Sequence, residues 1–121
     1  MKVLITCSGI SNTGKLTTQA ALTLLQRRPG RYLWMHAKQS ASSLEEAAGD
    51  ADLAVVLDGC SDCCAGKKIS PCSSVPQIQV IATELGIVKN GMGEVRFAEI
   101  ETVVTHVEKI VQEKEVGSGV S

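Results

Sequence analysis

An apolar run that leads into a cysteine-rich segment constrains this chain more than any other feature. The run Leu53–Leu57 reads LAVVL and is followed by Asp58, Gly59 and Cys60. A short run rich in branched aliphatic residues predicts a strand buried on both faces, as in parallel sheets. Gly59 suits a backbone that turns sharply or approaches another group closely, and Asp58 can accept hydrogen bonds from the loop amides that follow. Ligands of open α/β sheets bind beyond the carboxyl ends of the strands, so we expect the functional site here.

Hydrophobic periodicity predicts the other elements of the chain. Leucines and alanines at helical spacing indicate an early helix, and a stripe of valines and isoleucines opposite charged residues indicates a late one. A short helix between them can begin with a capping box formed by Ser43 and Glu46. The predicted helices cover Lys15–Arg28, Leu44–Gly49 and Ala98–Lys114, and the predicted strands cover Lys2–Thr6, Tyr32–His36, Leu53–Leu57 and Gln77–Ala82.

This order of elements predicts an α/β fold. Strands that alternate with helices run parallel and are joined by right-handed crossovers. We expect a three-layer, flavodoxin/Rossmann-like fold around a mostly parallel four-stranded sheet in strand order 2-1-3-4. The first and third strands are then neighbours about 5 Å apart, so Cys7 and Cys60, which follow them, face one crevice. A single domain is expected over residues 1–115, followed by a disordered tail over residues 116–121.

Charge and composition argue against two classes of partner. Lysine plus arginine is 12 and aspartate plus glutamate is 13, so the net charge of −1 attracts neither nucleic acid nor an anionic membrane. One Trp, one Tyr and one Phe leave few rings for base stacking. No apolar stretch approaches the ~20 residues needed to span a bilayer, and the start of the chain lacks a signal-peptide pattern. We expect a cytoplasmic protein, and the sequence identifies no protein partner.

The five cysteines point to thiol chemistry. The cytoplasm keeps thiols reduced, so clustered cysteines there are metal ligands or redox groups rather than a disulfide framework. Zinc takes thiolates at tetrahedral sites, commonly a close pair from one loop with ligands from a distant segment. Cys60 and Cys64 form such a pair, and Cys7 is the remote thiol. The candidates for the fourth ligand are Cys63, Cys72 and His36.

A thiol redox or sulfur-transfer enzyme is the alternative. Cys60 and Cys63 have the CxxC spacing, so Cys60 or Cys64 could act as a nucleophile whose intermediate a neighbouring thiol resolves. Such a mechanism does not need a remote thiol, and the presence of Cys7 therefore favours a metal site. The residues alone leave open whether the protein is an enzyme, and they admit zinc, iron or copper.

A near match to a phosphate-binding loop follows the first strand. Gly9–Leu16 fits the pattern GxxxxGK[ST] except at its last position, where Leu16 replaces the hydroxyl that binds magnesium. Thr17 comes one residue late and lies about 100° further around the helix, which makes it a poor substitute. The start of the helix remains a candidate for binding a phosphate or other anion through Gly9, Asn12 and Gly14.

Three motifs occur together between residues 3 and 90. They are CSGISNTG at Cys7–Gly14, Asp58-Gly59-Cys60 with Cys64-Ala65 after it, and ELGIVK at Glu84–Lys89. In combination they resemble the DGC-domain family, small prokaryotic proteins named for the Asp-Gly-Cys motif. The resemblance implies zinc binding through Cys7, Cys60 and Cys64 and implies no particular reaction. Two thiols of the family pattern are missing, since Ile10 replaces one and the segment ending at His36 lacks the other.

Overall fold

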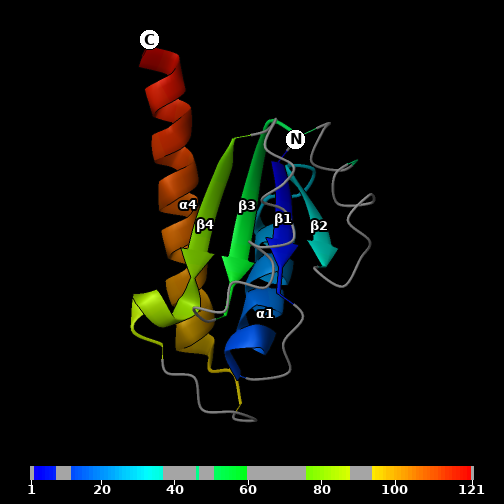
Figure 1. The fold of residues 1–121 in the computed structure, drawn as a ribbon, viewed down its shortest axis with the longest axis vertical. Helices are drawn as coiled ribbons and strands as arrows, with labels where there is room; N and C mark the ends of the chain where they lie inside the picture. Colours follow the sequence, from blue (N-terminus) through cyan, green and yellow to red (C-terminus); the bar gives the residue numbers. More distant parts are fainter. Residues whose placement is uncertain are drawn as a thin grey trace.

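The computed structural model describes residues 2–7, 12–36, 46, 51–59, 76–87 and 94–120, with the backbone alone over residues 115–120. This part of the chain forms four strands, two long helices and one 3-10 helix, and Figure 1 shows their arrangement. The strands are β1 (Lys2–Thr6), β2 (Tyr32–His36), β3 (Leu53–Asp58) and β4 (Gln77–Ile81); the helices are α1 (Asn12–Arg27), η1 (Ala82–Leu85) and α4 (Phe97–Val120).

The strands form one parallel sheet in the order β2-β1-β3-β4, which confirms the predicted order. Leu4 of β1 lies opposite Trp34 of β2 and Val55 of β3, so β1 is an inner strand. Every residue of β3 is buried, as its apolar run predicted. The edge strand β4 exposes Gln77 and Gln79, in line with their alternation with apolar residues.

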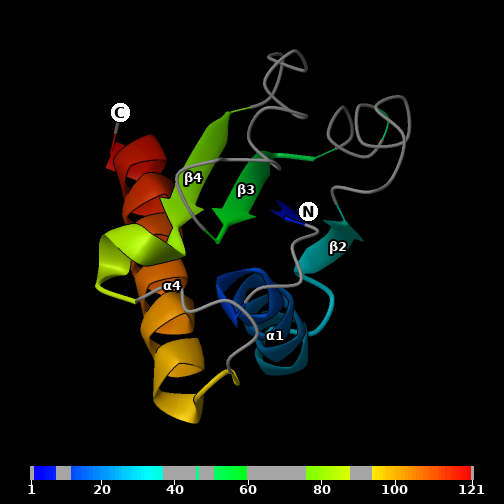
Figure 2. The same cartoon turned by 60° about the horizontal axis from the view of Figure 1, so that its bottom comes forward.

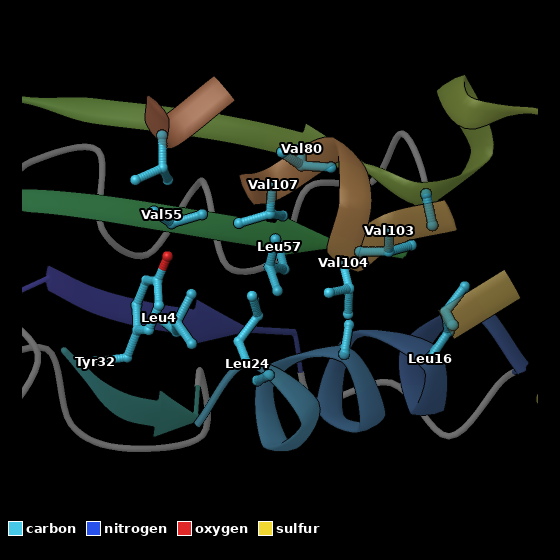
Figure 3. Packing of buried hydrophobic residues seen from close by; sticks show 14 of the residues in the cluster. Leu4, Leu16, Leu24, Tyr32, Val55, Leu57, Val80, Val103, Val104 and Val107 are labelled. Carbon is cyan, nitrogen blue, oxygen red and sulfur yellow. The ribbon is translucent and has the colours of Figure 1, made fainter. Parts of the chain in front are cut away.

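Both long helices lie against the same face of the sheet (Figure 2). Aliphatic residues of the strands meet leucines and valines of the two helices there (Figure 3). The cluster includes Leu4, Leu16, Leu24, Val55, Leu57, Val80, Val103, Val104 and Val107. The alternate residues of the two inner strands point to the opposite face and are buried as well; they are Val3, Ile5, Ala54 and Val56. Both faces are therefore covered, as a three-layer α/β fold requires.

The two long helices extend beyond their predicted bounds. Helix α1 begins at Asn12 rather than Lys15, so Asn12, Thr13 and Gly14, which precede the predicted helix, form its first turn and are buried. Tertiary packing overrides their weak helix propensity. Helix α4 continues past Lys114 to Val120, into the segment predicted as a tail. A helix that has formed gains one hydrogen bond for each residue it adds, which allows such an extension.

The remaining elements agree closely with the predictions or cannot be compared. Strands β1 and β2 have their predicted bounds, and β3 is longer by Asp58. Ala82 begins η1 instead of ending β4, and Gly86 with φ of 85° ends η1. The helix predicted over Leu44–Gly49 lies outside the described residues except for Glu46. Among the described helices, none is long and apolar enough to cross a membrane.

Candidate functional site

The carboxyl ends of β1 and β3 meet at one edge of the sheet. Thr6, the last residue of β1, lies opposite Leu57. The backbone amide of Cys7 donates a hydrogen bond to the carbonyl oxygen of Leu57 at 3.1 Å, so the pairing continues one residue beyond β1. Cys7 therefore lies beside the segment Asp58-Gly59, at the edge where the sequence predicted the site.

Gly59 packs directly against the backbone of α1. A Cβ atom at this position would lie 2.7 Å from the carbonyl carbon of Thr13 and 2.9 Å from the amide nitrogen of Gly14. Both distances are shorter than van der Waals contact, and both involve backbone atoms of the buried first turn of the helix. Close approach, rather than a sharp turn of the chain, is therefore the reason for glycine in the Asp-Gly-Cys motif.

The thiol of Cys7 contacts the hydroxyl group of Thr17. Both side chains are buried, with exposed fractions of 7% and 1%. The sulfur lies 3.6 Å from Oγ1 of Thr17, which itself donates a hydrogen bond to the carbonyl oxygen of Gly14 at 2.8 Å. A hydroxyl group has one hydrogen, so the Cys7 thiol is the donor in its contact with Thr17. The sequence pattern indicates Thr17 only as a poor magnesium ligand and gives no sign of this contact.

Asp58 is a buried carboxylate at the end of β3. Its exposed fraction is 1%, and its Oδ2 accepts a hydrogen bond from Nε2 of Gln79 at 3.1 Å. A buried carboxylate requires donors to offset its lost hydration, and the amide of Gln79 supplies one from the neighbouring strand β4. The loop amides after Gly59, which the sequence predicted as further donors, lie outside the described residues.

His36 ends β2 at the same edge of the sheet. It lies opposite Thr6 in the register, one strand away from the end of β1 that leads to Cys7. Its ring meets that of Trp34 in a T-shaped arrangement, with centroids 6.3 Å apart and an interplanar angle of 74°. The indole Nε1 of Trp34 donates a hydrogen bond to Oγ1 of Thr6 at 2.9 Å, which connects this aromatic pair to β1.

The other predicted site residues divide into two groups. Asn12 and Gly14 of the predicted anion site lie in the buried first turn of α1. Within the described ranges, no group of three His, Cys, Asp or Glu side chains is arranged to hold a metal ion. The predicted residues outside those ranges are Gly9, Cys60, Cys63, Cys64 and Cys72.

Thr17 is the described side chain whose hydroxyl group contacts the Cys7 sulfur. Sulfur is the donor that zinc prefers at structural sites, and ligand atoms there usually accept hydrogen bonds from nearby groups. The hydroxyl of Thr17 lies 3.6 Å from the sulfur and could supply such a bond if it released the carbonyl oxygen of Gly14. The described residues are thus compatible with one thiolate of a zinc site, and His36 lies at the same edge of the sheet.

The family model of the DGC domain matches residues 3–107. The chain belongs to the DGC-domain family. The part of the chain that matches the DGC domain includes Cys7, Thr17, His36, Asp58 and Gly59, so it covers every described residue of the candidate site. Comparison with curated proteins and with solved structures gave no match.

Proposed function

We propose that this DGC-domain protein binds zinc, or another thiophilic metal, through Cys7, Cys60 and Cys64. The observation that carries the proposal is the hydrogen bond of 3.1 Å from the Cys7 amide to Leu57, which holds the remote thiol beside the strand that leads to the other cysteines. Cys60 is bonded directly to Gly59, and consecutive Cα atoms are about 3.8 Å apart. The second proposed ligand therefore follows a residue that packing against α1 fixes in place.

The proposed donor set is compatible with zinc. Three thiolates with one further ligand make a closed tetrahedral site, whereas a water in the fourth position would make the metal a Lewis acid. Cys63, Cys72 and His36 are the candidates for the fourth ligand. The proposed setting is the cytoplasm, where reducing conditions keep thiols available. Storage, sensing or delivery of the metal is the proposed class of function.

Thr17 supports Cys7 in this proposal. A metal would be held by the Cys7 thiolate, whose proton would pass to solvent. The Thr17 hydroxyl, which donates to Gly14 at 2.8 Å, would then turn toward the sulfur 3.6 Å away. A hydrogen bond to a charged acceptor is stronger than one to a neutral carbonyl, which favours this change of partner.

The proposal is tested by elemental analysis of protein purified anaerobically without a metal-affinity tag, together with a count of free thiols. About one zinc per chain and protected thiols are expected, as for a closed tetrahedral site. Cys7→Ser is expected to remove the metal. Cys72→Ser is the matched variant, because it removes metal only if Cys72 is the fourth ligand.

Absence of metal from the native protein would contradict the proposal. If Cys7→Ser also left thiol–disulfide exchange at Cys60 and Cys63 intact, the protein would be a thiol redox or sulfur-transfer enzyme instead. Full metal content in Cys7→Ser would show that the ligand assignment is wrong.

A further inference from the structure

A cavity of about 260 Å³ lies at the amino edge of the sheet, between the turn that joins α1 to β2 and the helix α4. Lys2, which begins β1, and Tyr32, which begins β2, both line it. Cys7 follows the other end of β1, so the cavity and the proposed metal site lie at opposite edges of the sheet. A ligand in this cavity would therefore be bound independently of the proposed metal site.

A tight turn brings two guanidinium groups to the cavity. The turn Arg28-Pro29-Gly30-Arg31 is closed by a hydrogen bond of 3.2 Å from the amide of Arg31 to the carbonyl oxygen of Arg28, and Gly30 has φ of 77°. Proline followed by a glycine with positive φ is typical of a type II turn, whose first and fourth Cα atoms lie within about 7 Å. The amide of Lys2 donates to the carbonyl oxygen of Arg31 at 3.0 Å, which brings a third cation to the same place.

The charges that line the cavity do not balance. Lys2, Arg28 and Arg31 are cationic, and Glu108 is the one carboxylate among the lining residues. Oε2 of Glu108 accepts a hydrogen bond from Nη2 of Arg28 at 2.8 Å. Within the part of the chain that the structure describes, the guanidinium of Arg31 has no side-chain partner. The site therefore has an excess of positive charge, although the whole protein has a net charge of −1.

Another nearby carboxylate does not remove this excess. The pKa of Asp52 is lowered chiefly by a hydrogen bond from the amino group at the start of the chain, with a smaller contribution from the charge of Lys2. Asp52 is thus engaged mainly with a different cation, and it does not line the cavity.

We propose that this cavity binds a small molecule through a phosphate group, held by Arg31, Arg28 and Lys2. Guanidinium groups match phosphate oxygens in pairs, and an ammonium adds a further charged donor. The buried ring of Tyr32 and the side chain of Val111 supply an apolar wall beside these donors. Pockets for drug-sized ligands usually measure about 300–1,000 Å³, so this cavity suits inorganic phosphate or a small phosphate monoester.

The proposal is tested by titrating the full chain with inorganic phosphate and, separately, with glycerol phosphate at constant ionic strength. Backbone amide NMR shifts of Lys2, Arg31 and Tyr32 are expected to saturate with either ligand. Tighter binding of glycerol phosphate would identify a monoester as the preferred source of the phosphate group, and equal binding would identify free phosphate. Chloride at the same ionic strength is expected to cause no saturating shift.

Three variants make the test specific. Arg31→Gln is expected to weaken binding about ten-fold or more, because it removes a charged hydrogen-bond donor. Arg96→Gln removes the same charge from an exposed position outside the cavity and is expected to leave binding unchanged. Glu108→Gln is expected to strengthen binding, because it removes the one carboxylate from the lining.

Several results would overturn the proposal. Shifts that do not saturate, or that chloride reproduces, would show general screening of charge. Equal weakening of phosphate binding by Arg31→Gln and Arg96→Gln would also show general screening of charge. Arg31 is exposed, so its substitution is expected to leave the fold intact; Lys2→Gln provides a second variant, which is also expected to weaken binding.

Discussion

The sulfur of Cys7 lies 3.6 Å from the hydroxyl oxygen of Thr17, which joins the end of β1 to the second turn of α1. The same hydroxyl donates to the carbonyl oxygen of Gly14 at 2.8 Å, so the sulfur is linked to the helix backbone through one side chain. In the described part of the chain, Thr17 is the side chain that forms a hydrogen bond with this sulfur. This contact and others described above lead to four predictions.

Thr17→Val is expected to weaken zinc binding about ten-fold or more, because groups that orient metal ligands typically contribute 10–100-fold to affinity. Thr17→Ser keeps the hydroxyl and is expected to bind nearly as tightly as the native protein. Competition with a chromophoric chelator measures both affinities. Thr23→Val is the control, since the hydroxyl of Thr23 also bonds a helix carbonyl, that of Gln19 at 2.8 Å, at an exposed site. Equal affinity in Thr17→Val and the native protein would rule out this role of Thr17.

Gly59→Ala is expected to lower the free energy of unfolding by about 2 kcal/mol or more, because overpacking against rigid groups costs about 1–3 kcal/mol and the clash here is with backbone. The new Cβ would lie 2.7 Å from the carbonyl carbon of Thr13. Gly86→Ala is the comparison, with φ of 85° but no atom within 4 Å of the added Cβ. It is expected to cost only about 1 kcal/mol of conformational strain. Urea unfolding measures both, and equal losses would argue against the close approach of α1 to Gly59.

Gln79→Glu is expected to destabilise the protein at pH 7, because it places a second carboxylate against Asp58, whose Oδ2 is 3.1 Å from Nε2 of Gln79 in the native protein. Two neighbouring carboxylates repel each other only while both are ionised. The loss is therefore present at pH 7 and disappears as the pH falls and a proton binds to one of them. Its size is expected to be about 1 kcal/mol, because Gln79 is exposed to solvent.

The control for this pH dependence is Gln77→Glu, which makes the same charge change on the same strand but lies opposite Ala54. Chemical unfolding at pH 4 and pH 7 compares the two variants. A pH dependence common to both would arise from total charge rather than from the pairing with Asp58.

Glu108→Gln is expected to lower the Tm slightly at low ionic strength, and the difference is expected to vanish near 1 M salt, where the Debye length is about 3 Å. Glu108 pairs with Arg28 at 2.8 Å and with Arg27 at 4.0 Å, and Arg27 also bonds Glu101, so these groups connect α1 to α4. The hydrogen bond to Glu108 is the main cause that raises the pKa of Arg28.

The matched control is Glu113→Gln, an exposed carboxylate on α4 for which the described residues provide no ion-pair partner. Thermal unfolding over a salt series is the measurement. A salt-independent loss in Glu108→Gln would indicate that packing of its side chain, rather than its charge, stabilises the contact between the helices.

The sheet could be predicted from the sequence because its inner strands carry continuous apolar runs and because parallel connections have one handedness. The start of α1 could not. Asn12, Thr13 and Gly14 are small and polar, and their local pattern indicates a turn. Their helical conformation depends on packing against Gly59, a residue distant in the chain, which no local pattern contains.

The candidate site, like the fold, could be predicted only in part from the sequence. The predicted strand order places the ends of β1 and β3 side by side, and the hydrogen bond from the Cys7 amide to Leu57 confirms this placement. The contact with Thr17 depends on how α1 is rotated against the sheet, and the bond between Gln79 and Asp58 depends on the register of β4. The roles of Cys60, Cys63, Cys64 and Cys72 stay predictions, since these residues lie outside the described part of the chain.

The hydrogen bond from the Cys7 amide to Leu57 cannot form during synthesis until Leu57 has been added to the chain. Ribosomes add about 5–20 residues per second, and Leu57 is synthesised about fifty residues after Cys7, which amounts to several seconds. Until β3 emerges, β1 lacks one of its two neighbouring strands and the Cys7 amide lacks its acceptor. The first thiol of the chain is thus synthesised early and positioned late, and the speed of translation determines how long it stays accessible to oxidants on the nascent chain.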